Sequence, residues 1–338
     1  MEVDVNQTNK RVVLDFWSSL DELAPRLDSS ALAAAVRWFG FDPIGNLTGS
    51  GSFFDDFWFP FRKSFPVINR ETHIFFAGKS NGRVDGDIGK DGHRWVSGTG
   101  LISGKFEHDY LGIPANGESV KIRWGEFCKL EGGLITEIYF QFDLIDLAQQ
   151  VGVELLPPSL GRPGVYPPPG AGDGVLLDAQ DPEESDYTLQ HIRQFIFEGL
   201  NGFDEANLRS MGMADYFHPE VCWYGPAGIG ACLSFEEFEN NHQKPWLAAF
   251  PDRRVQDLDA LIGEGAYSGG PGWAGVKGRH TGTYLNCPAT GNAIEFNGLD
   301  WWKREGERYI ENWVFVDMIH LFKQFGIDLL ENLPRSDN

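Results

Sequence analysis

The sequence predicts an α+β protein made of two copies of one domain, and three observations carry this prediction. The chain has 338 residues, more than a single domain of roughly 150 residues needs. A stretch rich in proline and glycine lies near its middle, and the segments on either side of it share a residue pattern at constant spacing.

The repeat is clearest in the last third of each half. Residues 106–152 and 280–326 align without a gap and are identical at 14 of 47 positions. The shared positions include a turn motif, YLxxPAxG, that begins at Tyr110 and again at Tyr284. They also include an aspartate after the last expected strand of each half, Asp143 and Asp317. One spacing kept across a turn and several elements indicates a duplicated domain.

The domain boundaries follow from the middle stretch. Residues 153–185 hold seven prolines and five glycines and show neither a helical nor a strand period. Three consecutive prolines within it favour an extended backbone. We therefore expect a first domain at 1–152, a linker at 153–185 and a second domain at 186–333.

In the first half, the pattern predicts helices followed by strands. Helices are expected near 12–39 and 53–64, and strands near 94–110, 119–130 and 134–143. The glycines of KLEGG, residues 129–133, mark a tight hairpin turn between the last two strands.

The second half repeats this order. Amphipathic helices are expected near 186–200 and 234–249, followed by extended segments near 253–262, 272–284, 292–303 and 307–317 and a short helix at 318–325. In the last strand, Trp313 and Asp317 fall on one face by period 2, and Asn312 and Val314 fall on the other.

Composition excludes several classes of partner and site. The formal net charge of −21 disfavours nucleic acid and anionic membrane surfaces. No apolar run is long enough to span a membrane and no secretory signal opens the chain, so we expect a cytoplasmic protein. The four cysteines and eight histidines match no metal-site spacing, and there is no phosphate-binding glycine motif. Neither a metal nor a cofactor is expected.

The second half resembles a known family over its last 50 residues. Its pattern runs from His280 through HTGTYLNCPATG, then ENWVFVD ending at Asp317, then QFG at 324–326. This pattern is similar to the SnoaL-like polyketide cyclases, within the wider nuclear-transport-factor-2-like fold. The first half keeps the turn, Asp143 and the final glutamine and glycine, but it has Phe106 in place of His280 and Tyr139 in place of Trp313.

The resemblance implies tandem cone-shaped α+β barrels, each a curved, mostly antiparallel sheet packed on N-terminal helices around an apolar pocket. It also implies a cofactor-free cyclase, isomerase or dehydratase acting on a small hydrophobic, polyketide-like molecule. Asp317, and by repeat Asp143, would be the general acid/base, with His280 assisting.

Further residues are expected to bind the substrate. Trp313 and Tyr139 stand four positions before the two aspartates, on the same face, and would flank a planar molecule together with Tyr224. Trp301 and its neighbour Trp302 point to opposite faces, so at most one of them faces the pocket. Asp300 and its counterpart Glu126 would add a second carboxylate near each aspartate.

Several alternatives stay open at this point. Asp143 and Asp317 are also well placed to cap the following helix. His280, Glu126 and Asp300 could be structural or solvated. The chain could be a non-catalytic tandem binder, or a hydrolase of the epoxide-hydrolase type, whose Asp–Arg–Asp cluster would need Arg123 or Arg279. Relatives of this fold dimerise through the open sheet face, so we expect the two halves to form an intramolecular pseudo-dimer, and a homodimer of the whole chain is left open.

Overall fold

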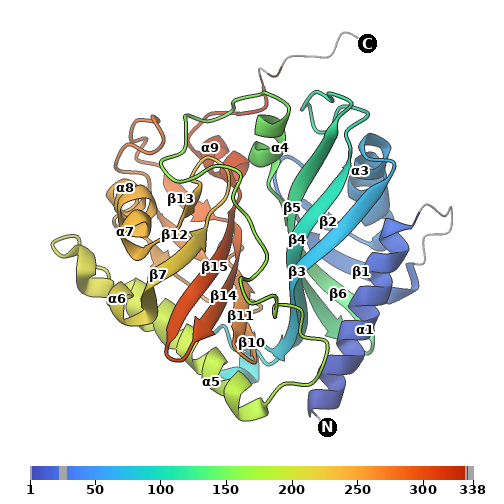
Figure 1. Ribbon diagram of the computed structural model, residues 1–338, viewed down its shortest axis with the longest axis horizontal. Helices are drawn as coiled ribbons and strands as arrows, with labels where there is room; N and C mark the ends of the chain where they lie inside the picture. Colours follow the sequence, from blue (N-terminus) through green and yellow to red (C-terminus); the bar gives the residue numbers. More distant parts are fainter. Residues whose placement is uncertain (1, 23–28, 332, 334–338) are drawn as a thin grey trace.

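The computed structural model describes residues 2–22, 29–331 and 333. Two curved six-stranded sheets stand side by side, one from each half of the chain, and the segment that joins the halves runs between them (Figure 1). The α+β fold class expected from the sequence is confirmed, and the two sheets fit a tandem arrangement.

The first half builds one sheet, with strand order β2-β1-β6-β5-β4-β3. β1 runs parallel to β6, and the other pairs are antiparallel. In chain order the elements are α1 (Glu2–Asp21), β1 (Leu32–Phe39), β2 (Asn46–Thr48), α2 (Ser50–Ser52), a π-helical turn (Phe53–Trp58), α3 (Phe59–Ser64), β3 (Ile68–Lys79), β4 (Arg94–Lys105), β5 (Ser119–Glu131), β6 (Leu134–Phe142) and α4 (Leu144–Gln150).

The second half builds the other large sheet, with order β10-β11-β14-β15-β7-β8, and a small sheet, β13-β12-β9. Here β7 runs parallel to β15, as β1 does to β6. The elements are α5 (Pro182–Arg193), α6 (Met213–Tyr216), β7 (Phe217–Tyr224), β8 (Ala231–Cys232), α7 (Phe235–Phe238), α8 (Lys244–Ala249), β9 (Arg254–Val255), β10 (Ile262–Glu264), β11 (Tyr267–Pro271), β12 (Val276–Arg279), β13 (Ala293–Phe296), β14 (Gly298–Glu305), β15 (Arg308–Val316) and α9 (Met318–Gln324).

The central hairpins of the two sheets have the same register. Trp124 pairs with Phe142 between β5 and β6, and Gly298 pairs with Val316 at the corresponding positions of β14 and β15. Both hairpins slip by one residue at the same place, after Lys129 and after Lys303. The spacing of 174 residues seen in the sequence therefore also relates the two hairpins in space.

Several local expectations differ from the structure. The extended segment expected near 292–303 forms two strands of different sheets, β13 and β14. The helix expected at 12–39 ends at Asp21, and residues 32–39 form β1 instead. The run of three alanines in β1 favours a helix locally, but pairing with β6 and burial of Val36 and Trp38 favour the strand. The strands β3 and β7 were not expected from the sequence.

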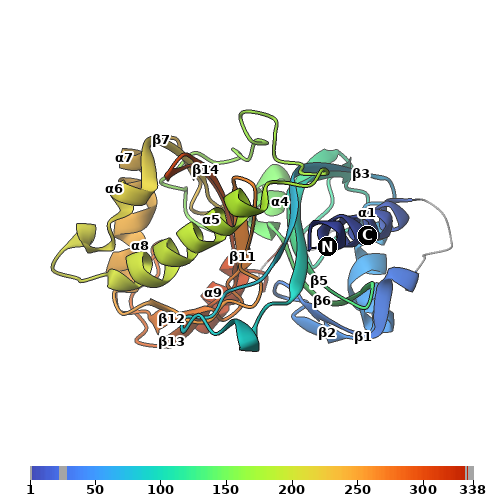
Figure 2. The same cartoon turned by 90° about the horizontal axis from the view of Figure 1, so that it is seen from below.

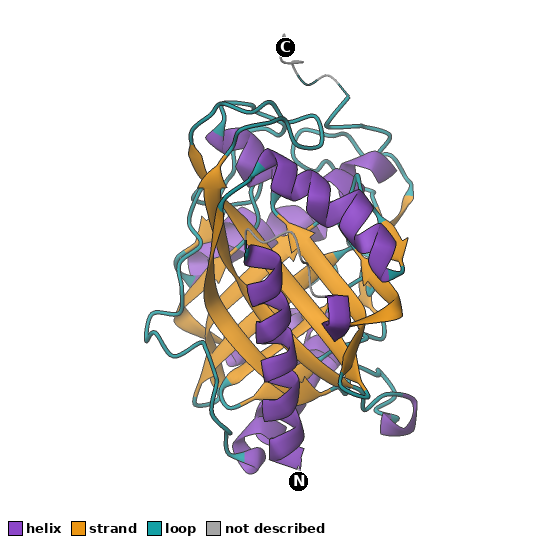
Figure 3. Cartoon of the chain, turned by 90° about the vertical axis from the view of Figure 1, so that its right-hand side faces the viewer, coloured by secondary structure: helices purple, strands orange, loops and turns teal. Residues whose placement is uncertain are grey.

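Helices cover the outer faces of the sheets, and the inner faces meet. α1 crosses the outer face of the first sheet (Figure 3), while α5, α7 and α8 lie on the far side of the second (Figures 1 and 2). Between the sheets, Phe127 stacks on Trp301 at 5.2 Å, and the Trp301 indole donates to the Ser97 hydroxyl at 2.8 Å. A Cβ on Gly125 would lie 2.4 Å from the Trp301 ring, so this contact requires glycine.

The joining segment contacts both sheets. Val175 forms a parallel bridge with Phe75 of β3, and Arg162 forms an antiparallel bridge with Ala231 of β8. Between these points the Trp313 indole donates to the Pro167 carbonyl at 2.8 Å. Among the described residues, no helix has the length and apolar character that a membrane span requires.

Candidate functional site

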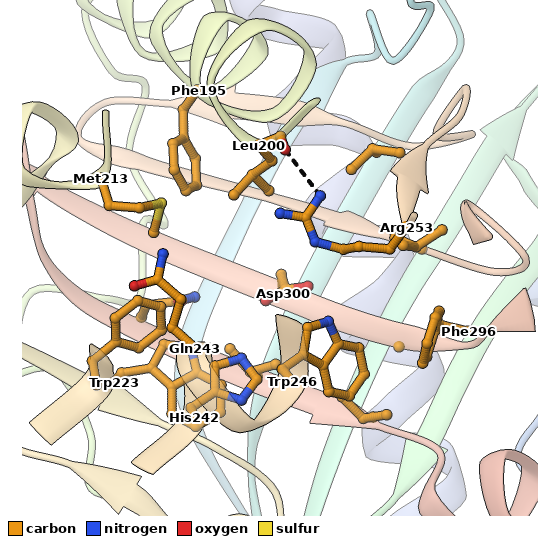
Figure 4. Close-up of a pocket in the computed structure, with 18 of the residues that line it drawn as sticks. Phe195, Leu200, Met213, Trp223, His242, Gln243, Trp246, Arg253, Phe296 and Asp300 are labelled. Carbon is orange, nitrogen blue, oxygen red and sulfur yellow. Dashed lines mark hydrogen bonds between the residues drawn. The ribbon is translucent and has the colours of Figure 1, made fainter. Parts of the chain in front are cut away.

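A cavity of about 190 Å³ lies inside the second half, between the outer face of its sheet and the helices that cover it (Figure 4). Most of its wall is aliphatic or aromatic, and a few polar side chains interrupt it. Such an apolar cavity with few polar groups is the usual form of a small-molecule site. Lining residues include Phe195, Leu200, Met211, Met213, Phe217, Trp223, Phe238, His242, Gln243, Trp246, Arg253, Val255, Phe296, Gly298, Asp300, Trp302, Asn312, Val314 and Val316.

The cavity exists because three large residues of the first half have small counterparts in the second. The repeat aligns Trp124 with Gly298, and β6 carries a phenylalanine at each of two positions where β15 has Val314 and Val316. All three small residues line the cavity. In the first half, Trp124, Phe140 and Phe142 are buried in the core, where Phe140 packs on Phe57 and Phe142 on Phe61 at 5.0 and 4.8 Å.

Asp300 is the carboxylate of this cavity. It sits on β14 and faces the cavity interior from below the helices (Figure 4). Burial raises its pKa to about 8, and hydrogen bonding with Asn312 opposes the rise. No charged side chain contributes to this shift, so desolvation alone keeps the proton on the carboxyl. A carboxyl with a pKa near neutrality can act as acid or base.

The corresponding carboxylate of the first half is closed off. Glu126 accepts a hydrogen bond from the Trp17 indole at 2.7 Å and another from the Cys128 thiol at 3.1 Å. Trp17 comes from α1 and packs edge-on against Trp124 at 4.9 Å. Burial raises the pKa of Glu126 as well. Its side chain is nonetheless enclosed by other side chains, so Glu126 has a structural role in the core.

Three polar side chains face Asp300 from the other walls. His242 stacks on Trp223 at 4.1 Å, and burial, followed by the nearby positive charge of Arg253, lowers its pKa to about 3, so it is neutral. Gln243 is 5% exposed, and neither its amide oxygen nor its amide nitrogen has a partner in the described chain. Arg253 donates to the Leu200 carbonyl at 2.9 Å. Figure 4 shows these groups around one space, with Asp300 at its floor.

Only two of the residues expected from the sequence line this cavity, Asp300 and Trp302. Trp313, Tyr224 and Tyr139 lie on the opposite face, in the core between the sheets. Tyr224 contacts Trp313 at 5.4 Å, while the Tyr139 hydroxyl donates to Asp259. The strands are buried on both faces, so alternation alone does not indicate which face lines a cavity.

Asp143 caps α4 and Asp317 caps α9, which is the helix-capping role that the sequence left open for both aspartates. Asp317 accepts from the His320 backbone at 2.9 Å, and Asp143 accepts from the Asp146 backbone at 3.0 Å. Each also reaches the opposite half of the chain. The second oxygen of Asp317 accepts from the Asp42 backbone at 2.8 Å, and that of Asp143 accepts from the Ala227 backbone at 2.9 Å.

Asp317 lines a separate, polar recess. This recess, of about 500 Å³, lies where the two halves meet and also includes Asp42, His320 and Lys323. Burial raises the pKa of Asp317 to about 6, and backbone hydrogen bonds from His320 and Asp42 oppose the rise. The aspartate is thus outside the apolar cavity.

His280 is fully buried beside the small sheet and does not line the cavity. Its ring stacks on Phe325 at 3.9 Å, and Nδ1 lies 3.2 Å from the Thr290 hydroxyl. Phe106 occupies the matching place in the first half and stacks on Phe65 at 4.7 Å. Burial lowers the pKa of His280, so its ring packs as a neutral aromatic.

The arginine required by the hydrolase alternative does stand beside Asp143. Arg123 lies 3.5 Å from both Asp143 and Asp146, and its guanidinium donates to the Gly225 carbonyl at 2.9 Å. All three charged side chains are buried at the junction of the halves, with the Arg123 guanidinium over the Tyr166 ring. They line none of the cavities described above. Arg279 instead bonds a carbonyl at the surface.

The sequence assigned no role to His242, Gln243 or Arg253, which all line the cavity. Each is a single polar residue in an ordinary helical or extended segment, with no motif around it. The alignment of the repeat did hold a signal, because Gly298 opposite Trp124 marks where the second half has room. Within the described residues, no group of three or more histidine, cysteine or acidic side chains is arranged to hold a metal ion.

Comparison with known proteins finds a family match in the half of the chain that contains this cavity. Residues 199–325 match the family model described as SnoaL-like polyketide cyclase. This stretch spans the cavity lining from Leu200 to Val316. No curated protein matches the chain.

Several solved structures are similar to part of the chain. TsrD from Streptomyces laurentii is 22% identical over 43% of this chain and 97% of its own, with a TM-score of 0.32. IdmH from Streptomyces antibioticus is 17% identical over 41% of this chain and 99% of its own, with a TM-score of 0.33. A Jannaschia protein, assigned provisionally as a SnoaL-like polyketide cyclase, is 15% identical over 44% of this chain and 96% of its own, with a TM-score of 0.37.

Proposed function

We propose that the second half is a SnoaL-like domain that binds a small, flat, hydrophobic molecule and transfers protons with Asp300, without a cofactor. The observation that carries the proposal is the cavity itself, in which a desolvated carboxyl with a pKa of about 8 faces a largely apolar space lined by aromatic and aliphatic side chains. The match of residues 199–325 to the SnoaL-like polyketide cyclase model supports it.

The chemistry would be proton transfer at a carbon next to a carbonyl. As a carboxylate, Asp300 takes a proton from that carbon and leaves an enolate. As the acid so formed, it returns the proton to the enolate carbon or to the oxygen, so the group ends as it began. A catalytic pKa close to the working pH favours both steps. In an isomerase, return of the proton to another carbon of the enolate completes the reaction. In an aldol cyclase the enolate carbon bonds to a second carbonyl of the same molecule, and the oxygen of that carbonyl takes the proton. In a dehydratase the enolate expels a β-hydroxyl group, which takes the proton and leaves as water.

The size of the cavity limits the ligand. An engineered cavity of about 150 Å³ lined by apolar side chains binds benzene. The cavity here measures about 190 Å³. A molecule with a single ring or two fused rings therefore fits better than a larger polycyclic compound.

The first half has a supporting role in this proposal. Its cone is filled by Trp17 and Trp124, and its carboxylate, Glu126, is bonded to Trp17. We propose that residues 1–152 and 186–333 are two domains paired as an intramolecular pseudo-dimer, joined by the segment 153–185.

Reciprocal contacts support this pairing. Asp143 reaches Ala227 of the second half, while its counterpart Asp317 reaches Asp42 of the first. Phe127 and Trp301, which correspond in the repeat, stack on each other. Contacts in which residue i meets j and j meets i are those of a two-fold symmetric interface.

A non-catalytic binder is the second candidate. It is favoured because no charged group is among the causes of the Asp300 pKa shift, so this carboxyl titrates without a charged partner. The two candidates differ in one measurable property, which is proton transfer to and from a bound ketone.

The experiment uses 2-tetralone, a ketone of two fused rings with exchangeable C–H bonds. Its hydrogen–deuterium exchange in heavy water would be followed by NMR with and without the protein. We expect the protein to accelerate exchange, Asp300→Asn to remove the acceleration, and Glu126→Gln, the same change at the matching filled position, to leave it intact. Binding of 2-tetralone without faster exchange would favour the binder, and loss of exchange in Asp317→Asn with retention in Asp300→Asn would refute the assignment to Asp300.

A further inference from the structure

Arg253 is a buried cation that forms no ion pair with a carboxylate among the residues that the structure describes. It is 5% exposed and lines the cavity. Its guanidinium donates to the Leu200 carbonyl at 2.9 Å and to the Met211 sulfur at 2.8 Å, and it lies over the Phe203 ring at 5.6 Å. A guanidinium has five N–H donors, and none of these three contacts supplies a negative charge.

Other buried cations of the described chain are paired. Lys10 lies 2.8 Å from Glu264, Arg123 lies 3.5 Å from Asp143 and Asp146, and Arg304 pairs with Glu184. Placing a charge in the protein interior is unfavourable unless an opposite charge or a full set of hydrogen bonds accompanies it. Within the described residues, Arg253 therefore departs from the way this protein treats its buried cations.

Asp300 does not neutralise this charge. It lines the same cavity, but no ion pair joins the two groups, and Arg253 is not among the causes of the Asp300 pKa shift. Burial lowers the pKa of Arg253 to about 10, which leaves the guanidinium charged at neutral pH. Since the Asp300 carboxyl keeps its proton up to about pH 8, the described lining of the cavity carries one positive charge that no carboxylate compensates.

A second polar group of the cavity also lacks a partner. The amide of Gln243 is buried, and its oxygen and nitrogen bond to nothing in the described chain. A buried amide without a partner is unfavourable by about 1–3 kcal/mol. The cavity thus presents a positive charge and an amide without a partner, while most of its remaining wall is aliphatic or aromatic.

We propose that the natural ligand carries an anionic oxygen, such as a carboxylate or an acidic enol, that pairs with Arg253. The aromatic body of the ligand packs against Trp223, Trp246 and Trp302, and the Gln243 amide bonds a second oxygen. This inference rests on the proposed binding function of the cavity and adds the charge of the ligand to it. The same pairing stabilises an enolate formed when Asp300 removes a proton.

The test compares two probes of nearly equal shape, 2-naphthoate and 2-naphthamide, by isothermal titration calorimetry with the full chain at pH 7. We expect the anion to bind at least tenfold more tightly than the amide. Equal affinities would overturn the charge pairing while leaving the binding function standing. If neither probe binds, the proposed binding function fails, and this inference fails with it.

Variants of the arginine separate charge from structure. Arg253→Gln should weaken 2-naphthoate at least tenfold and change 2-naphthamide less than threefold, while Arg253→Lys should keep the preference for the anion. Arg254→Gln, the same change at the exposed neighbour, should alter neither affinity. An equal loss for both probes in Arg253→Gln would mean that Arg253 only holds the Leu200 segment in place, and would overturn the proposal.

Discussion

Replacing Asp300 by asparagine removes the carboxyl group of the cavity and keeps the size of the side chain. In the unfolded chain this carboxyl loses its proton near pH 3.8, whereas in the folded protein it does so near pH 8. Between these values the folded state binds more protons than the unfolded state, so the wild-type protein loses stability as the pH rises. Above about pH 8 both states are ionised and this loss is complete.

The size of the effect follows from the pKa shift. Each unit corresponds to about 1.4 kcal/mol, and the interval from pH 5.5 to the folded pKa spans about 2.5 units. The wild-type protein should therefore lose up to about 3 kcal/mol of unfolding free energy between pH 5.5 and pH 9 through this group alone. Asp300→Asn lacks this group and should not show that loss. Between pH 5.5 and pH 9, the unfolding free energy of the variant should therefore rise relative to that of the wild type by about 1–3 kcal/mol.

Urea unfolding followed by tryptophan fluorescence at pH 5.5 and pH 9 measures the difference. Other titrating groups cancel because they are common to both proteins. The exposed Asp215 offers a matched control, since Asp215→Asn should change the unfolding free energy by the same amount at pH 5.5 and at pH 9. Parallel pH dependence of the wild type and Asp300→Asn would refute the reasoning that burial holds the proton on Asp300.

Two further predictions concern the junction of the halves and the origin of the cavity. Asp317→Ala removes a helix cap and the hydrogen bond from the Asp42 backbone, so we expect it to lower the unfolding free energy by about 1–3 kcal/mol in a urea titration. It should not slow the hydrogen–deuterium exchange of 2-tetralone, and loss of that exchange in a folded variant would contradict the prediction. Val314→Phe introduces the residue that the first half has at this position and should fill the cavity. We expect the affinity for 2-naphthamide, measured by calorimetry, to fall at least tenfold, while the melting temperature stays the same or rises. Unchanged affinity would show that the probe binds elsewhere.

Much of the fold could be predicted because its signals are local. The glycines of the hairpins and the caps Asp143 and Asp317 act within a few residues of themselves, and the expected hairpin strands and the final helix lie where the structure has them. β1 was mistaken for helix because its pairing partner, β6, is about 100 residues away. The sequence window around β1 contains no trace of that partner.

The candidate site was predicted less well, for a reason that lies in the strands themselves. β15 is buried on both faces, with Trp313 against the other sheet and Val314 against the cavity. A one-residue step changes the face, and the apolar pattern is nearly the same on both sides. The family resemblance predicted a site at Trp313 and Asp317, whereas the cavity is lined by the opposite face of β15.

The sequence by itself determined that one α+β pattern occurs twice, where its turns fall and which partners its charge disfavours. It could do so because spacing, turn residues and net charge are properties of the chain alone. Only the tertiary structure decided which face of β14 and β15 encloses space. In the first half, Trp17 and the phenylalanines fill the volume beneath the helices. In the second half the smaller residues leave part of that volume open. The meeting of Asp300, Gln243 and Arg253 in one cavity likewise depends on packing between segments far apart in the chain.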